Sequence, residues 1–144
     1  MNDKWDRRYL GLAKHVSQWS KDPRKKVGAV VTEGKYVRSI GFNGFPTGIA
    51  DTKARLSDPS IKLQVILHAE VNALAAALGK GDTIYVYPCL PCTQCLSQII
   101  QHNIKRIVSV LNKKSTVTKW NPDLVLSLAK EANLEVNFID IKES

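Results

Sequence analysis

Two short motifs, far apart in the chain, constrain the fold of this sequence more than any other feature. His68-Ala69-Glu70 stands upstream of Pro91-Cys92-Thr93-Gln94-Cys95. One imidazole and two thiolates can hold a zinc ion, and three protein ligands leave the fourth tetrahedral position open for water. The chain must therefore fold so that His68, Cys92 and Cys95 meet around one metal-sized space.

Glu70 gives this metal-binding pattern a catalytic interpretation. A zinc ion in an open site brings the pKa of its water molecule close to neutrality. A carboxylate beside that water takes a proton as a base and returns it as an acid within one reaction cycle. The pairing of H-x-E with P-C-x-x-C is the signature of zinc-dependent nucleobase deaminases, in which the glutamate is not a ligand. We therefore predict hydrolytic deamination, with Glu70 as the catalytic residue and His68, Cys92 and Cys95 as metal ligands.

The third cysteine, Cys89, leaves alternatives open. Pro88-Cys89-Leu90-Pro91-Cys92 has the same spacing as the motif, so the ligand pair is either Cys92 with Cys95 or Cys89 with Cys92. We favour the first pair because the apolar residues after Cys95 continue a helix whose first turn, with its partial positive charge, holds both thiols. A fourth ligand from Cys89, Glu70 or a distant histidine would close the site and make the zinc structural. Neither of the remaining histidines, His15 and His102, is assigned to the metal site.

Length and composition predict one domain without a membrane segment. The chain has 144 residues, of which 44% are hydrophobic, so we expect a single globular domain over residues 1–144. No apolar run approaches the ~20 residues that span a bilayer, and the stretch from Met1 to Asp6 lacks the apolar segment of a secretory signal. Clustered cysteines spaced by threes are typical of metal binding in a reducing compartment. We therefore expect a cytoplasmic protein with no membrane partner.

The charge of the chain favours anionic ligands. The formal net charge is +8 at pH 7, and a positive field attracts nucleotides and nucleic acids. The basic residues are not concentrated in one tail, so we expect a small nucleotide and no nucleic-acid partner.

Helical and strand patterns alternate along the sequence. We predict helices over residues 5–19, about 68–78, 92–101 and from 121 onwards, and strands over residues 27–32, 36–42, 83–87, 106–111 and 134–141. This order predicts an α/β fold, with a mixed five-stranded sheet and helices on both faces. The helix over 68–78 is expected to bury Val71, Leu74, Ala75 and Leu78. Residues 44–62 are predicted to form a long polar loop that includes at most one short helical turn. A loop of this length in a compact domain usually has a function.

Five segments together resemble the deoxycytidylate (dCMP) deaminase family, within the cytidine and deoxycytidylate deaminase superfamily. They are Ser20-Lys21-Asp22-Pro23, Val27-Gly28-Ala29, Gly41-Phe42-Asn43-Gly44-Phe45-Pro46, His68-Ala69-Glu70-Val71-Asn72-Ala73 and Pro91-Cys92-Thr93-Gln94-Cys95. The similarity runs from about Trp5 to Val110. The zinc motif marks the superfamily, whereas the S-K-D-P and G-F-N-G-F-P segments point to this family. The chain departs from the common pattern by one additional residue between Thr83-Ile84-Tyr85-Val86 and the cysteine motif.

The resemblance implies a fold, a reaction and a set of substrate contacts. The fold would be a three-layer αβα, cytidine-deaminase-like one, with Zn²⁺ as the catalytic cofactor. The reaction would convert dCMP to dUMP and ammonia and so supply dUMP for thymidylate synthesis. Asn43 would touch the deoxyribose, the backbone N–H of Ala69 would lie near the base carbonyl, and Pro91 would line the substrate site.

The resemblance also implies regulation and assembly. The family is typically a homohexamer, activated by dCTP and inhibited by dTTP, with Mg²⁺ accompanying the triphosphate. The candidate contacts to an effector or to a phosphate are Lys21, Asp22, Arg24, Asn43 and Gly44.

Other interpretations of these segments stay open. Gly41-Phe42-Asn43-Gly44 contains the Asn-Gly pair of an ordinary turn, and the basic residues at positions 21 and 24–26 form either a solvated loop or a phosphate site. Two other functions are compatible with the zinc motif: a tRNA adenosine deaminase that acts on a flipped base, and an inactive deaminase fold that serves as a binding module.

Overall fold

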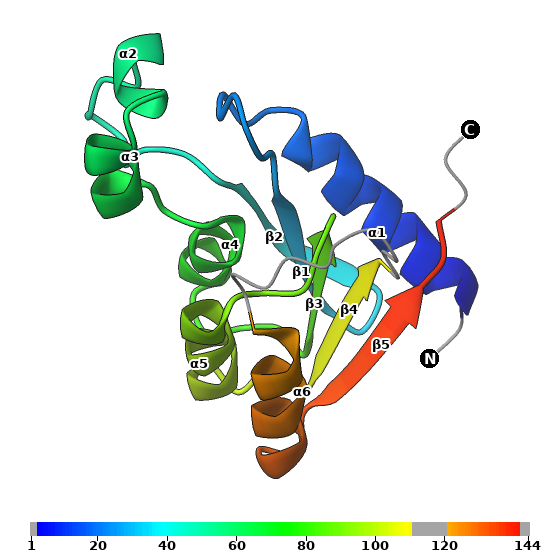
Figure 1. The fold of residues 1–144 in the computed structure, drawn as a ribbon. Helices are drawn as coiled ribbons and strands as arrows, with labels where there is room; N and C mark the ends of the chain where they lie inside the picture. The colour runs from blue at the N-terminus through cyan, green and yellow to red at the C-terminus, as the bar shows by residue number, and fades with distance from the viewer. Residues whose placement is uncertain (1–2, 111–120, 142–144) are drawn as a thin grey trace.

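A mixed five-stranded sheet runs through the middle of the fold (Figure 1). The computed structural model describes residues 3–110 and 121–141. Within them the strands are β1 (Gly28–Glu33), β2 (Tyr36–Phe42), β3 (Thr83–Tyr87), β4 (Arg106–Val110) and β5 (Glu135–Ile139). Their order in the sheet is β2-β1-β3-β4-β5. β1 pairs antiparallel with β2 and with β3, whereas β3, β4 and β5 are parallel to one another. The mixed sheet predicted from the sequence is confirmed.

Helices cover both faces of the sheet and complete three αβα layers (Figure 1). α1 (Asp3–Ser17) lies on one face, and α4 (Ala69–Ala77), α5 (Thr93–Gln101) and α6 (Pro122–Glu131) lie on the other. Two short helices, α2 (Lys53–Leu56) and α3 (Pro59–Val65), extend from the same side as α4. In the part of the chain described, none of these helices has the length and apolar character that crossing a bilayer requires.

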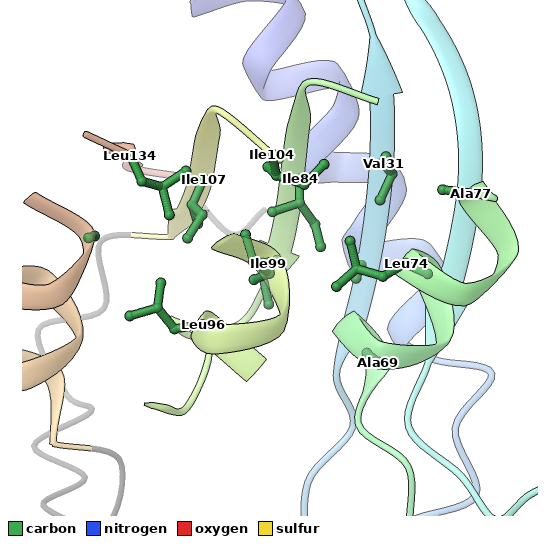
Figure 2. Close-up of a cluster of buried hydrophobic side chains, with 14 of the residues drawn as sticks. Val31, Ala69, Leu74, Ala77, Ile84, Leu96, Ile99, Ile104, Ile107 and Leu134 are labelled. Atoms are coloured by element: carbon green, nitrogen blue, oxygen red, sulfur yellow. The ribbon is translucent and has the colours of Figure 1, made fainter. Parts of the chain in front are cut away.

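Each face of the sheet has its own hydrophobic core. Figure 2 shows the larger one, in which side chains from α4 and α5 pack onto the sheet. Its fully buried members include Val31, Ile84 and Ile107 from the strands and Leu96 and Ile99 from α5. Alternate residues of the same strands point to the other face, where they pack on α1. This period-two alternation is what a sheet covered on both faces requires.

A buried ion pair ties α1 to the sheet beneath it. The Asp6 carboxylate accepts hydrogen bonds from the Arg106 guanidinium at two oxygens and from the Tyr85 hydroxyl at 2.9 Å. Asp6 is 2% exposed. Burial by itself raises the pKa of Asp6, but the hydrogen bonds from Arg106 and Tyr85 outweigh it and leave the pKa below its usual value. Asp6 lies in the first turn of α1, so this ion pair fixes the start of the helix on the sheet.

The inner face of α4 differs from the prediction. The helix buries Ala73, Leu74 and Ala77, whereas Ala75 is exposed and Leu78 is 84% exposed after the helix has ended. The reason is the closeness of β2, because a Cβ at Gly41 would lie 2.5 Å from the Ala69 carbonyl oxygen. Only small side chains fit between backbones at that separation. The prediction from helical periodicity used only the positions of apolar residues. It did not take into account that the contact between α4 and β2 requires small side chains.

The predicted loop over residues 44–62 contains two helices where the sequence suggested one short turn. Thr52 caps the N-terminus of α2 by accepting from Arg55 N, and Asp58 caps α3 by accepting from Ser60 N. Pro59 follows Asp58 in the first turn of α3, where its missing N–H carries no cost. Both helices are too short for a periodic apolar pattern to reveal. The last residue of the predicted strand over 106–111, Leu111, lies outside the described residues.

Replacement of Asp6 by Asn is predicted to destabilise the fold by about 3 kcal/mol, because the Arg106 charge loses its buried partner. The free energy of unfolding in urea measures this. Asp3→Asn is the matched control: it breaks an exposed ion pair with Arg7 and is expected to cost less than about 1 kcal/mol. Since the folded-state pKa of Asp6 is lowered, the wild-type contribution is complete above the ordinary value of 3.8 and is lost as the pH falls through the folded-state value. Equal losses for the two variants would contradict this account.

Candidate active site

The strand register brings three segments to one edge of the sheet. Gly28, the first residue of β1, pairs with Phe42 at the end of β2 and with Tyr87 at the end of β3. The residues before β1, after β2 and after β3 therefore meet at this edge. In open α/β sheets the carboxyl ends of the strands are the usual place for a ligand.

The three predicted metal ligands lie together at the starts of two helices. His68 is the N-cap residue of α4, Cys92 is the N-cap residue of α5, and Cys95 lies in the first turn of α5. The Nδ1 atom of His68 lies 3.2 Å from the Sγ atom of Cys95 and 3.5 Å from that of Cys92. All three ligand atoms lie within 4.8 Å of one another.

This arrangement fits a tetrahedral zinc ion. Zinc bonds of about 2.3 Å to sulfur and about 2.0 Å to nitrogen place neighbouring ligand atoms about 3.5 Å apart in a tetrahedron. The distances from Nδ1 to the two sulfur atoms, 3.2 and 3.5 Å, are close to that separation. The donor set of one nitrogen and two sulfurs is one that zinc prefers, and it leaves one position for a non-protein ligand.

The electrostatics of the two thiols also suit a cation. A hydrogen bond from the Cys95 thiol, together with one from His68, lowers the pKa of Cys92 to about 4. The same contact with Cys92 raises the pKa of Cys95. The hydrogen bond with Cys92 raises the pKa of His68 as well. Of the two thiols, Cys92 therefore loses its proton more readily, and a bound metal ion would displace the remaining protons, since metals bind the deprotonated forms.

Glu70 is buried beside this cluster. Its side chain is part of the first turn of α4 and the residue is 4% exposed. Burial raises the pKa of the Glu70 carboxyl group above its usual value, and the negative charge of Cys92 acts in the same direction. A carboxyl group with a raised pKa is suited to accepting and returning a proton near neutral pH.

A cavity of about 260 Å³ opens over the cluster. His68, Ala69, Glu70 and Cys92 contribute to its lining. The remaining lining residues come from four other segments: Asp22, Arg24, Lys25 and Val27 before β1, Asn43 after β2, Lys62, Leu63 and Ile66 in and after α3, and Cys89 and Leu90 after β3. The cavity thus combines the candidate metal ligands with several charged side chains.

Asn43 and Asp22, two of the predicted contact residues, are buried in the cavity wall. The Asn43 amide donates to the carbonyl of Lys25 at 2.8 Å and to Asp22 at 3.3 Å, and its oxygen accepts from Val27 N at 2.9 Å. Phe42 ends β2, and the chain then continues to Gly44, whose backbone pairs with Leu67. The interpretation of this segment as a simple turn was therefore wrong.

The other predicted contacts are more dispersed. Ala69 is the first residue of α4 and lines the cavity, so its N–H is one of the first-turn amides that find no acceptor within the helix. Arg24 lines the cavity, whereas Lys21 pairs with Asp51 at 3.3 Å and does not. Pro91 is buried and precedes Cys92 without lining the cavity.

The structure separates Cys89 from the ligand group. Cys89 lines the cavity, and burial raises the pKa of its thiol, but it is not one of the three residues whose ligand atoms converge. His15 packs edge-on against Trp19, and His102 lies at the C-terminus of α5 with its ring against the Gln98 carbonyl. The geometry thus follows the favoured pair, Cys92 and Cys95.

Sequence reasoning missed the contribution of Lys62. This residue lies in α3, inside the segment taken as a loop, yet its ammonium reaches Asp22 at 2.8 Å and lines the cavity. No short motif surrounds it. The only signal was the Asp58-Pro59 pair, which starts a helix and so fixes where the following side chains point.

Comparison with known proteins identifies the family. The sequence profile described as "Cytidine and deoxycytidylate deaminase zinc-binding region" matches residues 3–111. The chain belongs to this deaminase family. An "Uncharacterized deaminase in luxG 3'region" of Aliivibrio fischeri is 34% identical to it over 98% of this chain and 97% of that protein.

Deoxycytidylate deaminases are also among the relatives of this deaminase. That of Mycobacterium phage D29 is 37% identical over 72% of this chain and 92% of its own length. That of Mus musculus is 34% identical over 76% of this chain and 66% of its own length. The solved dCMP deaminase of the cyanophage S-TIM5 has the same fold, with a TM-score of 0.74 at 22% identity over 96% of this chain and 100% of that one. A second structure of that phage protein contains dCMP and dUMP.

Cysteine substitutions distinguish the two possible ligand pairs. We expect the deaminase, purified with zinc, to hold close to one zinc ion per chain, and Cys92→Ser or Cys95→Ser to remove most of it. Cys89→Ser is the matched control and is expected to retain the metal, because its sulfur lies outside the ligand group. Elemental analysis of the purified variants measures the zinc content. Loss of zinc from Cys89→Ser with retention in Cys95→Ser would reassign the pair.

Proposed function

We propose that this protein is a zinc-dependent dCMP deaminase that converts dCMP to dUMP and ammonia. The observation that carries the proposal is the buried Glu70 carboxyl group beside an open set of three candidate metal ligands, in the wall of a cavity of about 260 Å³. Family membership and the names of the deoxycytidylate deaminase relatives support the same reaction. A purely structural zinc site has no need of a buried acid–base group, which argues against a binding module.

Glu70 would move the protons in this reaction. A zinc ion held by His68, Cys92 and Cys95 would supply an activated water molecule for attack on C4 of the cytosine ring. The Glu70 carboxylate accepts the proton that this water loses. It donates that proton to N3 of the ring, accepts the remaining proton from the new hydroxyl group at C4, and passes it to the amino group, which leaves as ammonia while the C4 carbonyl forms. Burial favours this role, because it raises the pKa of Glu70 towards neutral pH. Both the protonated and the deprotonated forms are then accessible during one reaction cycle.

The walls of the cavity would orient the nucleotide. The Ala69 N–H is available to the base carbonyl, since first-turn amides have no acceptor within the helix. Asn43 keeps one lone pair of its amide oxygen for the deoxyribose after accepting from Val27 N. Pro91 contributes indirectly, because it precedes the N-cap residue Cys92 and fixes the backbone there. The cations Arg24, Lys25 and Lys62 favour a phosphorylated substrate over a neutral nucleoside.

Replacement of Glu70 by Gln is predicted to reduce ammonia release from dCMP by at least about 100-fold, because the proton carrier is lost. Zinc content and thermal stability should remain close to those of the wild type. The wild type should release ammonia from dCMP in preference to cytidine, deoxycytidine and dCTP. Undiminished turnover by Glu70→Gln would refute the assigned role. Turnover by the wild type on an RNA stem-loop, with none on dCMP, would favour the tRNA adenosine deaminase alternative.

We further propose that the activity is regulated and serves thymidylate synthesis in the cytoplasm. The support for dCTP as activator, dTTP as inhibitor, accompanying Mg²⁺ and a homohexamer is the resemblance of the S-K-D-P and G-F-N-G-F-P segments to the family. The clustered thiols favour a reducing compartment. Lys21, Asp22, Arg24, Asn43 and Gly44 lie in the two segments that flank the cavity, so a ligand on them would act on the neighbouring site.

Regulation of this kind predicts a sigmoidal dependence of rate on dCMP concentration, because cooperative subunits respond together. Added dCTP with Mg²⁺ should make the curve hyperbolic, and dTTP should depress it. Initial rates at a series of dCMP concentrations measure the response, and light scattering gives the mass of the assembly in the same buffers. Hyperbolic kinetics that neither nucleotide alters would remove the allosteric proposal and leave the catalytic one intact.

A further inference from the structure

We propose that Lys62 determines the selectivity of the site for a 5′-phosphorylated substrate, with Asp22 as the residue that positions it. Lys62 lies in α3, which supplies none of the candidate metal ligands, and no motif of the sequence marks it. The inference rests on the proposed function, because it names the group that reads the phosphate of the same substrate.

Lys62 is held at the cavity wall by an almost buried ion pair. Its Nζ atom lies 2.8 Å from Oδ1 of Asp22, and the two side chains are 13% and 3% exposed. α3 itself has no fully buried residue, and its neighbour Leu63 is 75% exposed. The ion pair is therefore a principal tie between α3 and the segment that precedes β1, and it fixes where the ammonium group lies.

Asp22 acts on a ligand through its neighbours and not directly. Its Oδ1 atom accepts from Arg24 N at 2.8 Å, from Lys25 N at 3.2 Å and from Lys62, while Oδ2 accepts from the Asn43 amide at 3.3 Å. Each carboxylate oxygen has about two acceptor positions, so the three donors saturate Oδ1, and the Asn43 amide holds Oδ2. Hydrogen bonds to the charged form, of which the one from Lys62 is the largest, outweigh the effect of burial and lower the pKa of Asp22. Asp22 thus stays negative and holds the surrounding cations in place.

The ammonium of Lys62 has donors left for a ligand. It carries three N–H bonds, and among the described residues Asp22 is the acceptor that it reaches. Two donors therefore remain at the cavity surface. A phosphate group has several oxygens that accept such charge-assisted hydrogen bonds.

The charges that line the cavity are not balanced within it. Three cationic side chains, those of Arg24, Lys25 and Lys62, line the cavity together with two carboxyl groups, those of Asp22 and Glu70. In the proposed reaction, the candidate metal ligands and Glu70 act on the cytosine ring. The cations come from other segments, and a 5′-phosphate on the same nucleotide supplies the opposite charge.

The test compares substrates that differ only by the phosphate. Lys62→Met is predicted to lower kcat/KM for dCMP by about 10- to 100-fold, the usual effect of a lost charge-assisted hydrogen bond, and to leave kcat/KM for deoxycytidine nearly unchanged. Lys62→Arg should restore part of the preference because it keeps the charge. Lys53→Ala removes a lysine from the adjacent helix α2 that does not line the cavity, and it should keep the full preference. The ratio of the two kcat/KM values is insensitive to any loss of folded protein, since both substrates report on the same sample.

An unchanged ratio in Lys62→Met, or an equal loss for both substrates, would overturn the inference. Failure of the proposed function is distinguishable, because it would show as no turnover of dCMP by the wild type. In that case, calorimetric titration with dUMP and with deoxyuridine decides the role of Lys62. Tighter binding of dUMP by the wild type, lost in Lys62→Met and kept in Lys53→Ala, would support it. Equal affinities for the two ligands in the wild type would overturn it.

Discussion

The close packing around Gly28 is the constraint on which the rest of the structure depends. This residue pairs with the last residue of β2 and with the last residue of β3, and a Cβ at its position would collide with the carbonyl oxygen of Ala13 in α1. One residue therefore fixes the register of three strands and the distance of the helix on one face. On the other face, Gly41 sets the approach of α4 in the same manner. These two contacts determine where the segments that build the site begin and end.

The site has two parts with different physical requirements. The candidate metal ligands and Glu70 are carried by the starts of α4 and α5, whose apolar faces pack against the sheet (Figure 2). The charged wall is assembled from loop backbone and α3, and its organising group is the carboxylate of Asp22. Because that carboxylate is buried and accepts four hydrogen bonds, it gives an irregular segment a defined position through polar contacts.

The sequence was most informative where chemistry and spacing coincide. His68, Glu70, Cys92 and Cys95 were assigned from residue type and motif spacing, and the structure brings the three ligand atoms together with Glu70 beside them. The alternation of strands and helices predicted the mixed sheet for the same reason, since burial on two faces leaves a periodic trace. Residues 44–62 were described less well, because α2 and α3 are held by caps and by one ion pair, and such features leave no periodic trace.

The sequence by itself predicted the candidate metal ligands, the candidate acid–base residue and the order of the elements, because each depends on local composition and spacing. Only the tertiary structure decided that α4 packs on β2 through alanines, that Asp6 of α1 pairs with Arg106 of β4, and that Lys62 joins Asp22 in the cavity wall. The partners in these last two contacts are separated by 100 and 40 residues. Contacts of this kind depend on the three-dimensional arrangement of distant segments. A local sequence pattern does not contain that information.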